Sequence, residues 1–207
     1  MRVNTSIGEI GVSVNGRDFL FRPSLFAMQR LDDPIRSFVD IHNTDRSKNA
    51  ENQRFIASVE VLEACCDDDI SDLVGFMSPR YRGDSFAGFS WRIGRINFVD
   101  CVILASSLIR HGVIGVVPQQ SKKNEGKYSS KFEPRELAAL AMAHLGMSED
   151  EAWNLTVTGF ILAMRAKYPD PEAEKQQKNE ENLAKYDKIM GHLKKINAIR
   201  DAAKAGK

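Results

Sequence analysis

The segment INFVDCVILASSLIRHG, residues 96–112, contains the clearest helix in the sequence. Its large apolar residues recur every three or four positions, the spacing that gives an α-helix one apolar side. Gly112 follows the last apolar turn, and glycine is the residue most often found just after a helix C-terminus. The sequence therefore predicts a core helix over residues 96–111. The apolar side of this predicted helix carries Ile96, Val99, Ile103, Leu104 and Leu108.

Further helices are predicted on both sides of this segment from their apolar spacing and their end residues. Asp33 and Pro34 are typical of a helix N-terminus. Ser148 and Glu151 have the spacing of a capping box, in which each residue satisfies a backbone donor of the other. The predicted helices are a short one after Ser24, then 34–42, 52–66, 134–145 ending at Gly146, and 157–167 capped by Thr156.

Two short runs near the N-terminus alternate between apolar and polar residues, which is the pattern of half-buried strands. Asn15-Gly16 lies between them, and this pair favours a two-residue hairpin turn because both positions need a positive φ. We expect strands over residues 7–14 and 17–22. The predicted fold class is mainly α with an N-terminal β-hairpin, that is, α+β.

The order of these elements suggests four parts along the chain. Residues 1–114 are predicted to form a hairpin and helical domain, and residues 132–170 a C-terminal helical subdomain. A polar linker is expected over 115–131, and a charged amphipathic helix over 171–207. Residues 75–94 contain four glycines and a proline and are expected to form an irregular loop.

Composition limits the classes of function. The chain has 207 residues, 43% apolar and 28% charged, with a formal net charge of +1. Dedicated nucleic-acid and anionic-membrane binders usually carry a basic excess, which this chain lacks. Its three cysteines do not suggest a disulfide framework, and no apolar run has the length of a membrane span. The first residues lead into Gly8 and Glu9 and not into the apolar core of a signal peptide. We therefore expect a cytoplasmic protein that does not span a membrane.

Two clusters of metal-ligand types have simpler structural explanations. The aspartates from Asp67 to Asp72 lack the spacing of a calcium loop, and aspartate commonly caps short helices. Cys65, Cys66 and Cys101 have none of the spacings that zinc sites use, so we interpret them as small buried apolar residues. The sequence predicts no metal and no cofactor.

One pair of residues has the types needed for nucleophilic catalysis. Ser107 and His111 lie four positions apart on the predicted core helix, but no third group is placed to orient them. His111 is better explained at a helix C-terminus, where a protonated imidazole interacts favourably with the helix dipole. We predict that the protein is not an enzyme and has no catalytic residues.

The segment from residue 79 to residue 98 combines arginines with aromatic residues. Such side chains can bind phosphates and stack on bases, which is typical of single-stranded nucleic-acid binding. The same side chains also pack under ordinary loops, and the balanced charge of the chain weighs against nucleic acid. This binding role is kept as a less favoured alternative. The residues concerned are Arg80, Arg82, Arg92, Arg95, Tyr81, Phe86, Phe89, Trp91 and Phe98.

Four strings occur in this order along residues 19–170: FLFRPSLFAMQRLDDP, VLEACCDDDISDLVGF, LIRHGVIG and DEAWNLTVTGFILAMRAKYP. Together they resemble the tail assembly chaperones of long non-contractile-tailed bacteriophages. The resemblance implies a non-enzymatic protein that acts in the host cytoplasm, keeps the tape-measure protein soluble, helps recruit tail-tube subunits and is absent from the mature virion. In several such phages a translational frameshift yields a longer form of the chaperone. The resemblance therefore implies that a longer form of this protein is a further binding partner.

The last of these strings supplies candidates for partner binding, and the tail supplies more. Whether these residues form the core or the contact face stays open, although large apolar residues at helical spacing usually pack inward. An alternative function is a minor structural protein that remains in the tail. The candidate partner-binding residues are Trp153, Phe160, Met164, Tyr168, Tyr186, Met190 and Leu193.

Overall fold

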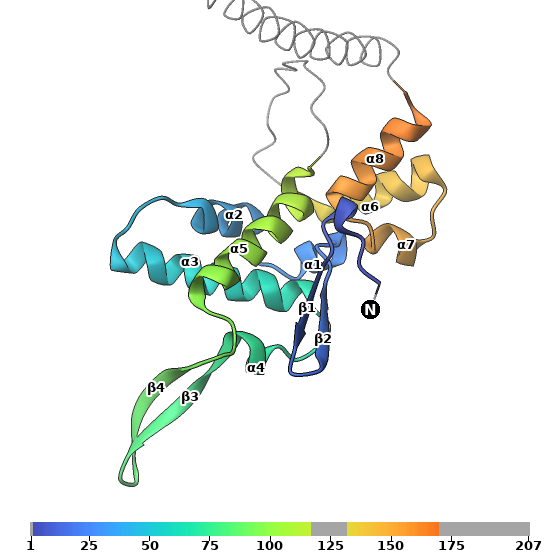
Figure 1. Ribbon diagram of the computed structural model, residues 1–207. Helices are drawn as coiled ribbons and strands as arrows, with labels where there is room; N and C mark the ends of the chain where they lie inside the picture. The colour runs from blue at the N-terminus through green and yellow to red at the C-terminus, as the bar shows by residue number, and fades with distance from the viewer. Residues whose placement is uncertain (1, 117–131, 170–207) are drawn as a thin grey trace, which may run out of the picture. The chain divides into compact units, whose positions relative to one another are not determined.

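The computed structural model describes residues 2–116 and 132–169. The described residues up to Lys167 belong to one compact unit of helices with two two-stranded antiparallel sheets (Figure 1). The predicted fold class, mainly α with an N-terminal β-hairpin, is confirmed. Most of the predicted linker over 115–131 and the whole of the predicted tail over 171–207 lie outside the described residues.

The predicted N-terminal hairpin is confirmed, although its first strand begins at Ile10 and not at residue 7. After a short 3₁₀ turn over Thr5–Ile7, strand β1 (Ile10–Val14) pairs with β2 (Arg17–Phe21). Asn15 and Gly16 have φ of 51° and 78°, as the two-residue turn requires. The side chains of β2 that face the helices are buried, so this strand covers part of the core.

The first core lies between this hairpin and helices α1, α2, α3 and α5. α3 packs against both α2 and α5. It begins four residues earlier than predicted because Ser47 is its N-cap, with Ser47 Oγ accepting a hydrogen bond from Ala50 N–H. Asp33 caps α2 and Asn97 caps α5 through their side chains. These elements are α1 (Leu25–Gln29), α2 (Pro34–His42), α3 (Lys48–Cys65), the single turn α4 (Ser71–Val74) and α5 (Phe98–Ile109).

The prediction that Gly112 ends the α5 segment is wrong. The chain continues through a π-helical turn, η2 (Arg110–Ile114), and turns away at Gly115, whose φ is 78°. Gly112 is buried against Met28, and a Cβ at this position would lie 2.6 Å from the Met28 sulfur. Glycine is therefore needed here for close packing between α1 and η2 and not for helix termination.

A second core follows. It is built from α6 (Pro134–Leu140), the π-helical turn η3 (Ala141–Leu145), α7 (Glu149–Trp153) and α8 (Val157–Lys167). The capping box of Ser148 and Glu151 is confirmed. Leu25 of α1 is fully buried in this core, and its N–H donates to Leu155 O over 2.7 Å. The buried residues here are Leu25, Ala138, Ala141, Ala152, Val157 and Phe160.

The irregular loop expected over residues 75–94 is instead a second β-hairpin, which we call the arm. Strand β3 (Gly75–Arg82) pairs with β4 (Ser85–Ile93), and the ribbon extends away from the helices (Figure 1). Gly83 and Asp84 form its two-residue turn, with Gly83 at φ 62°. Proline has no backbone N–H to donate to a neighbouring strand. Each strand of a two-stranded ribbon has one edge without a neighbouring strand, so Pro79 is compatible with this hairpin.

Candidate partner-binding surface

The arm has one face made of apolar side chains. Residues that pair directly across an antiparallel ribbon lie on the same face, and successive residues alternate between faces. The register pairs Met77 with Trp91, Pro79 with Phe89 and Tyr81 with Phe86. We call this side the apolar face. It consists of Met77, Pro79, Tyr81, Phe86, Phe89, Trp91 and Ile93.

A β-bulge keeps this face continuous toward the tip of the arm. The register shifts between Pro79 and Tyr81, so that two residues of β4, Ala87 and Gly88, lie opposite Arg80 alone. Gly88 has a φ of 97°, which glycine adopts without strain. In a regular strand Phe86 and Phe89, three residues apart, would point to opposite sides of the ribbon. The bulge therefore keeps the aromatic residues of the tip together.

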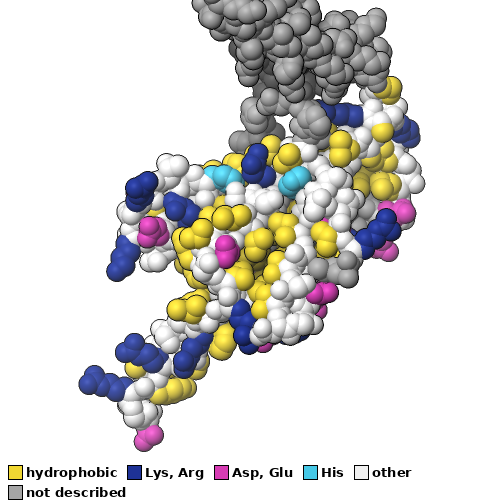
Figure 2. Space-filling view, viewed as in Figure 1, with side chains coloured by type: hydrophobic (Ala, Val, Ile, Leu, Met, Phe, Trp, Pro, Cys, Tyr) yellow, Lys and Arg dark blue, Asp and Glu magenta, His cyan; other side chains and the backbone are white. Residues whose placement is uncertain are grey.

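The apolar face is exposed over most of its length. Tyr81, Phe86 and Phe89 are 62%, 57% and 62% exposed, and the Phe86 ring contacts each of the other two edge to face. Figure 2 shows hydrophobic and arginine side chains close together on the arm. Because leaving large aromatic side chains in water is unfavourable, a contiguous exposed group of them is typical of an interaction surface.

The opposite face of the arm is basic. Arg80, Arg82 and Arg92 alternate with apolar-face residues and so point to the other side, together with Phe76. The segment 75–95 has four arginines and one acidic residue. Within residues 2–116 and 132–169, none of these arginines forms an ion pair. Their charges are therefore available to a partner.

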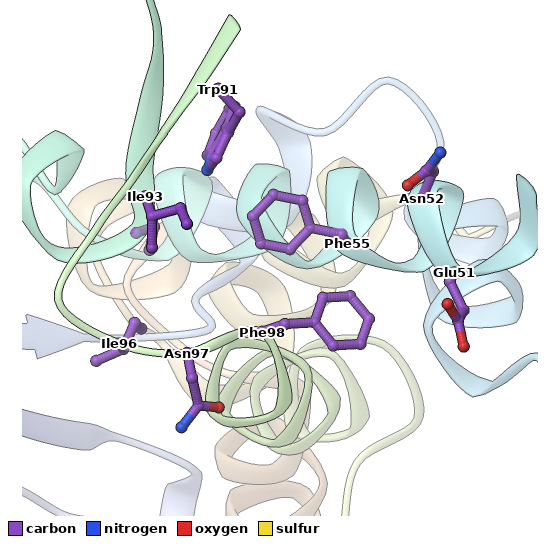
Figure 3. A pocket seen from close by; sticks show the side chains of 9 residues that line it. Glu51, Asn52, Phe55, Trp91, Ile93, Ile96, Asn97 and Phe98 are labelled. Atoms are coloured by element: carbon purple, nitrogen blue, oxygen red, sulfur yellow. The ribbon is translucent and has the colours of Figure 1, made fainter. Parts of the chain in front are cut away.

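A pocket of about 440 Å³ continues the apolar face where the arm joins the helices. The Phe55 ring of α3 lies 5.2 Å from that of Trp91 and 5.6 Å from that of Phe98, so the three elements meet in one aromatic cluster. Figure 3 shows Phe55 and Phe98 next to each other, with Trp91 and Ile93 of the arm on the same side. The pocket is thus lined mainly by apolar side chains.

The clusters that suggested chemistry in the sequence have structural roles. Cys65, Cys66 and Cys101 are buried free thiols, and burial raises the pKa of Cys101 to about 11, which disfavours the reactive thiolate. Asp69 accepts a hydrogen bond from Ser71 N–H, two residues on, in the turn before α4, whose N-cap is Ile70. No group of three or more potential ligands that could hold a metal ion occurs among the residues that the structure describes.

His111 has a different partner from the serine that its spacing suggested. His111 Nδ1 lies 2.8 Å from Thr158 Oγ1 of α8, and His42 Nε2 of α2 lies 2.9 Å from Ser106 Oγ. Burial lowers the pKa of His111 and the nearby positive charge of Arg110 lowers it further, which disfavours the protonated form considered in the sequence analysis. Both histidines link helices, and His42 Nδ1 also lies 2.9 Å from Phe38 O of its own helix.

The structure places three candidate residues of the last string, Trp153, Phe160 and Met164, in or beside the second core. Phe160 is buried, Trp153 and Met164 are partly buried against this core, and Tyr168 is exposed. Trp153 also contacts the exposed Phe26 ring, 6.4 Å away. Phe160 therefore contributes to packing, and a partner-binding role for these residues stays a prediction. The remaining candidates, Tyr186, Met190 and Leu193, lie outside the described residues.

Comparison with known proteins places the chain in a family. Residues 21–183 match the model of a family of unknown function, DUF6246. The chain belongs to this family. The part of this DUF6246 protein that matches includes the whole arm and both cores from the end of β2 onward. No curated protein and no solved structure matches the chain.

The apolar face of this DUF6246 member was missed by the sequence analysis, although its residues were noticed as an arginine and aromatic mixture. The alternation of apolar and polar residues around Tyr81 and Phe89, joined by Gly83-Asp84, is a β-hairpin pattern. Counting the glycines and Pro79 as loop residues hid that pattern. Among the described residues, no helix is both long and apolar enough to cross a lipid bilayer.

Proposed function

We propose that this protein is a non-enzymatic assembly chaperone of phage tails, which binds the tape-measure protein in the host cytoplasm and keeps it soluble. The observation that carries the proposal is the exposed apolar face of the arm with the aromatic pocket at its base. The four ordered strings that resemble tail assembly chaperones support it independently. Recruitment of tail-tube subunits, and association with a frameshifted longer form, belong to the same proposal.

The physical argument concerns what such a partner needs. By the resemblance, a tape-measure protein is a very long helical chain, whose apolar stripes would aggregate if they were left in water. An apolar surface on a small folded protein can cover such a stripe by helix-in-groove binding. The arm offers this surface without any rearrangement of the two cores, because its aromatic residues are already exposed.

Co-expression tests this function. We expect the tape-measure protein of the same phage to be recovered in soluble form, and in complex with this chain, when both are expressed together. The control is co-expression with an unrelated helical protein of similar size. An unchanged soluble yield together with no co-purification would contradict the proposal.

Retention in the virion separates a chaperone from a minor structural tail protein. A chaperone leaves the tail before assembly ends, so mass spectrometry of purified virions should detect tail-tube protein and not this chain. Detection of this chain at a fixed ratio to the tube protein would favour the structural role.

The exposed aromatics and free arginines of the arm keep single-stranded nucleic acid as a second candidate partner. The geometry is less favourable than the sequence suggested, because Tyr81, Phe86 and Phe89 lie on one face and Arg80, Arg82 and Arg92 on the other. A strand stacked on the aromatics would thus have the arginines behind the ribbon. Filter binding of an oligonucleotide at low salt tests this candidate.

A further inference from the structure

We infer that the apolar face of the arm and the pocket at its base bind an amphipathic helix whose apolar stripe is flanked by acidic side chains. This inference rests on the proposed function and specifies the chemistry of the segment that is bound. It also assigns the contact to the arm and its base, residues 75–98 with Phe55 of α3, and not to the second core.

The length and shape of the surface fit a helix. The eight residues of β3 extend about 27 Å, which equals the length of a helix of about 18 residues. The pocket of about 440 Å³ lies at one end of this track and is within the size range, about 300–1000 Å³, of pockets that take up compact apolar groups. An added β-strand would pair with the edge of the ribbon and leave the apolar face in water, so it explains the surface less well.

The positive charge of the arm indicates which side chains flank the apolar stripe of the bound helix. Arg80, Arg82, Arg92 and Arg95 are exposed, have no ion-pair partner within the described residues, and are opposed on the arm only by Asp84. Arg80, Arg82 and Arg92 point to the opposite face, but a two-stranded ribbon is a single layer, so their charge acts on a partner at the apolar face from within about 10 Å, the Debye length at moderate salt. Glu51 at the pocket is the acidic residue on the side of the base. An apolar face backed by positive charge is complementary to acidic residues beside an apolar stripe.

The test uses the full chain and two synthetic helical peptides of 18 residues. Both peptides carry the same leucine stripe, flanked by glutamate in one and by lysine in the other, and binding is followed by fluorescence anisotropy. We expect the glutamate peptide to bind about tenfold more tightly than the lysine peptide at low salt, since several exposed charge pairs together contribute about 1.4 kcal/mol. High salt should reduce this difference.

Two matched variants locate the contact. Phe89→Ser removes a ring from the apolar face, and Phe76→Ser makes the same change on the opposite face of the same ribbon. Both side chains are about half exposed or more, so neither change disturbs a core. We expect Phe89→Ser to weaken binding of the glutamate peptide about tenfold, as truncation of a central aromatic contact does, and Phe76→Ser to change it less than about twofold. The double variant Arg80→Glu with Arg92→Glu should lose the preference for the glutamate peptide.

Several outcomes would overturn the inference. Equal affinity for the two peptides rejects the acidic flanks, and equal effects of Phe89→Ser and Phe76→Ser reject the apolar face. Tighter binding of an oligothymidine, lost in Phe89→Ser, identifies nucleic acid as the occupant. A dimer in sedimentation that Phe89→Ser dissociates identifies a second copy. If the tape-measure protein co-purifies equally well with Phe89→Ser, the proposed function stands and this surface is wrong, whereas no co-purification with the wild-type chain rejects the function itself.

Discussion

His111 lies at the π-helical turn η2, with its Nδ1 2.8 Å from Oγ1 of the fully buried Thr158. Burial, and then the charge of Arg110, lower its pKa, so the folded state binds fewer protons than the unfolded state below the ordinary histidine pKa of about 6.5. This contribution to stability is complete above that pKa and declines as the pH falls through it. We expect the urea midpoint to be lower at pH 5.5 than at pH 7.5.

Two substitutions distinguish the titration of His111 from other causes of acid sensitivity. His111→Gln removes the titrating group and should reduce the difference between the midpoints at the two pH values. Arg110→Gln removes the neighbouring positive charge and should reduce it by a smaller amount. An unaltered pH dependence in His111→Gln would show that the acid sensitivity has another source.

The hydrogen-bond partners of single side chains could not be predicted from the sequence. A helical spacing of four made Ser107 the natural neighbour of His111, but the actual partner, Thr158, is 47 residues away on another helix. Likewise Ser106 contacts His42 across 64 residues. Local spacing identifies which residues share a helix face, but contacts between helices depend on tertiary packing, which no local pattern contains.

The helices and strands could be predicted where the local pattern of residues agrees with the packing of the folded protein. The N-terminal hairpin, α2 and the capping box were predicted because their turn and capping residues act within a few positions. The arm was missed because Pro79 and Gly88 were counted against strands. In this ribbon, Pro79 lies in a two-stranded sheet and Gly88 forms the bulge, so both residues are compatible with pairing.

Two glycines with the same positive φ differ in their surroundings. Gly16 and Gly115 both have a φ of 78°, but a Cβ at Gly16 meets nothing within 4 Å, whereas one at Gly115 would lie 2.6 Å from Ile161 Cδ1. We expect Gly16→Ala to lower the free energy of unfolding by about 1–2 kcal/mol from left-handed strain alone. Gly115→Ala should cost about 1–3 kcal/mol more because it also overpacks the contact with α8.

Chemical denaturation of the two variants measures both values. Equal losses would mean that Ile161 moves aside without cost, and that the end of η2 is determined by backbone conformation only. A larger loss at Gly115 is expected if the contact with α8, together with the ψ of 127° at Gly115, holds the end of η2.

The two cores share helix α1, although the sequence suggested separate parts. Met28 of α1 is buried in the first core and Leu25 of the same helix in the second. Leu25 N–H also donates to Leu155 O, and Ser24 forms an isolated bridge with Thr156. A five-residue helix with a side chain in each core cannot lose its contacts to one core without affecting the other. We therefore expect cooperative unfolding of both cores.

The chain's two tryptophans allow this cooperativity to be measured. Trp91 packs against the first core and Trp153 against the second, so the single-tryptophan variants Trp91→Phe and Trp153→Phe each report one of them. We expect the two fluorescence transitions in urea to coincide once the stability of each variant is allowed for. Leu25→Ala should destabilise the protein by about 2–5 kcal/mol and shift both transitions together. If only the Trp153 transition moved, the second core would be an independently folding subdomain, as the order of elements in the sequence suggested.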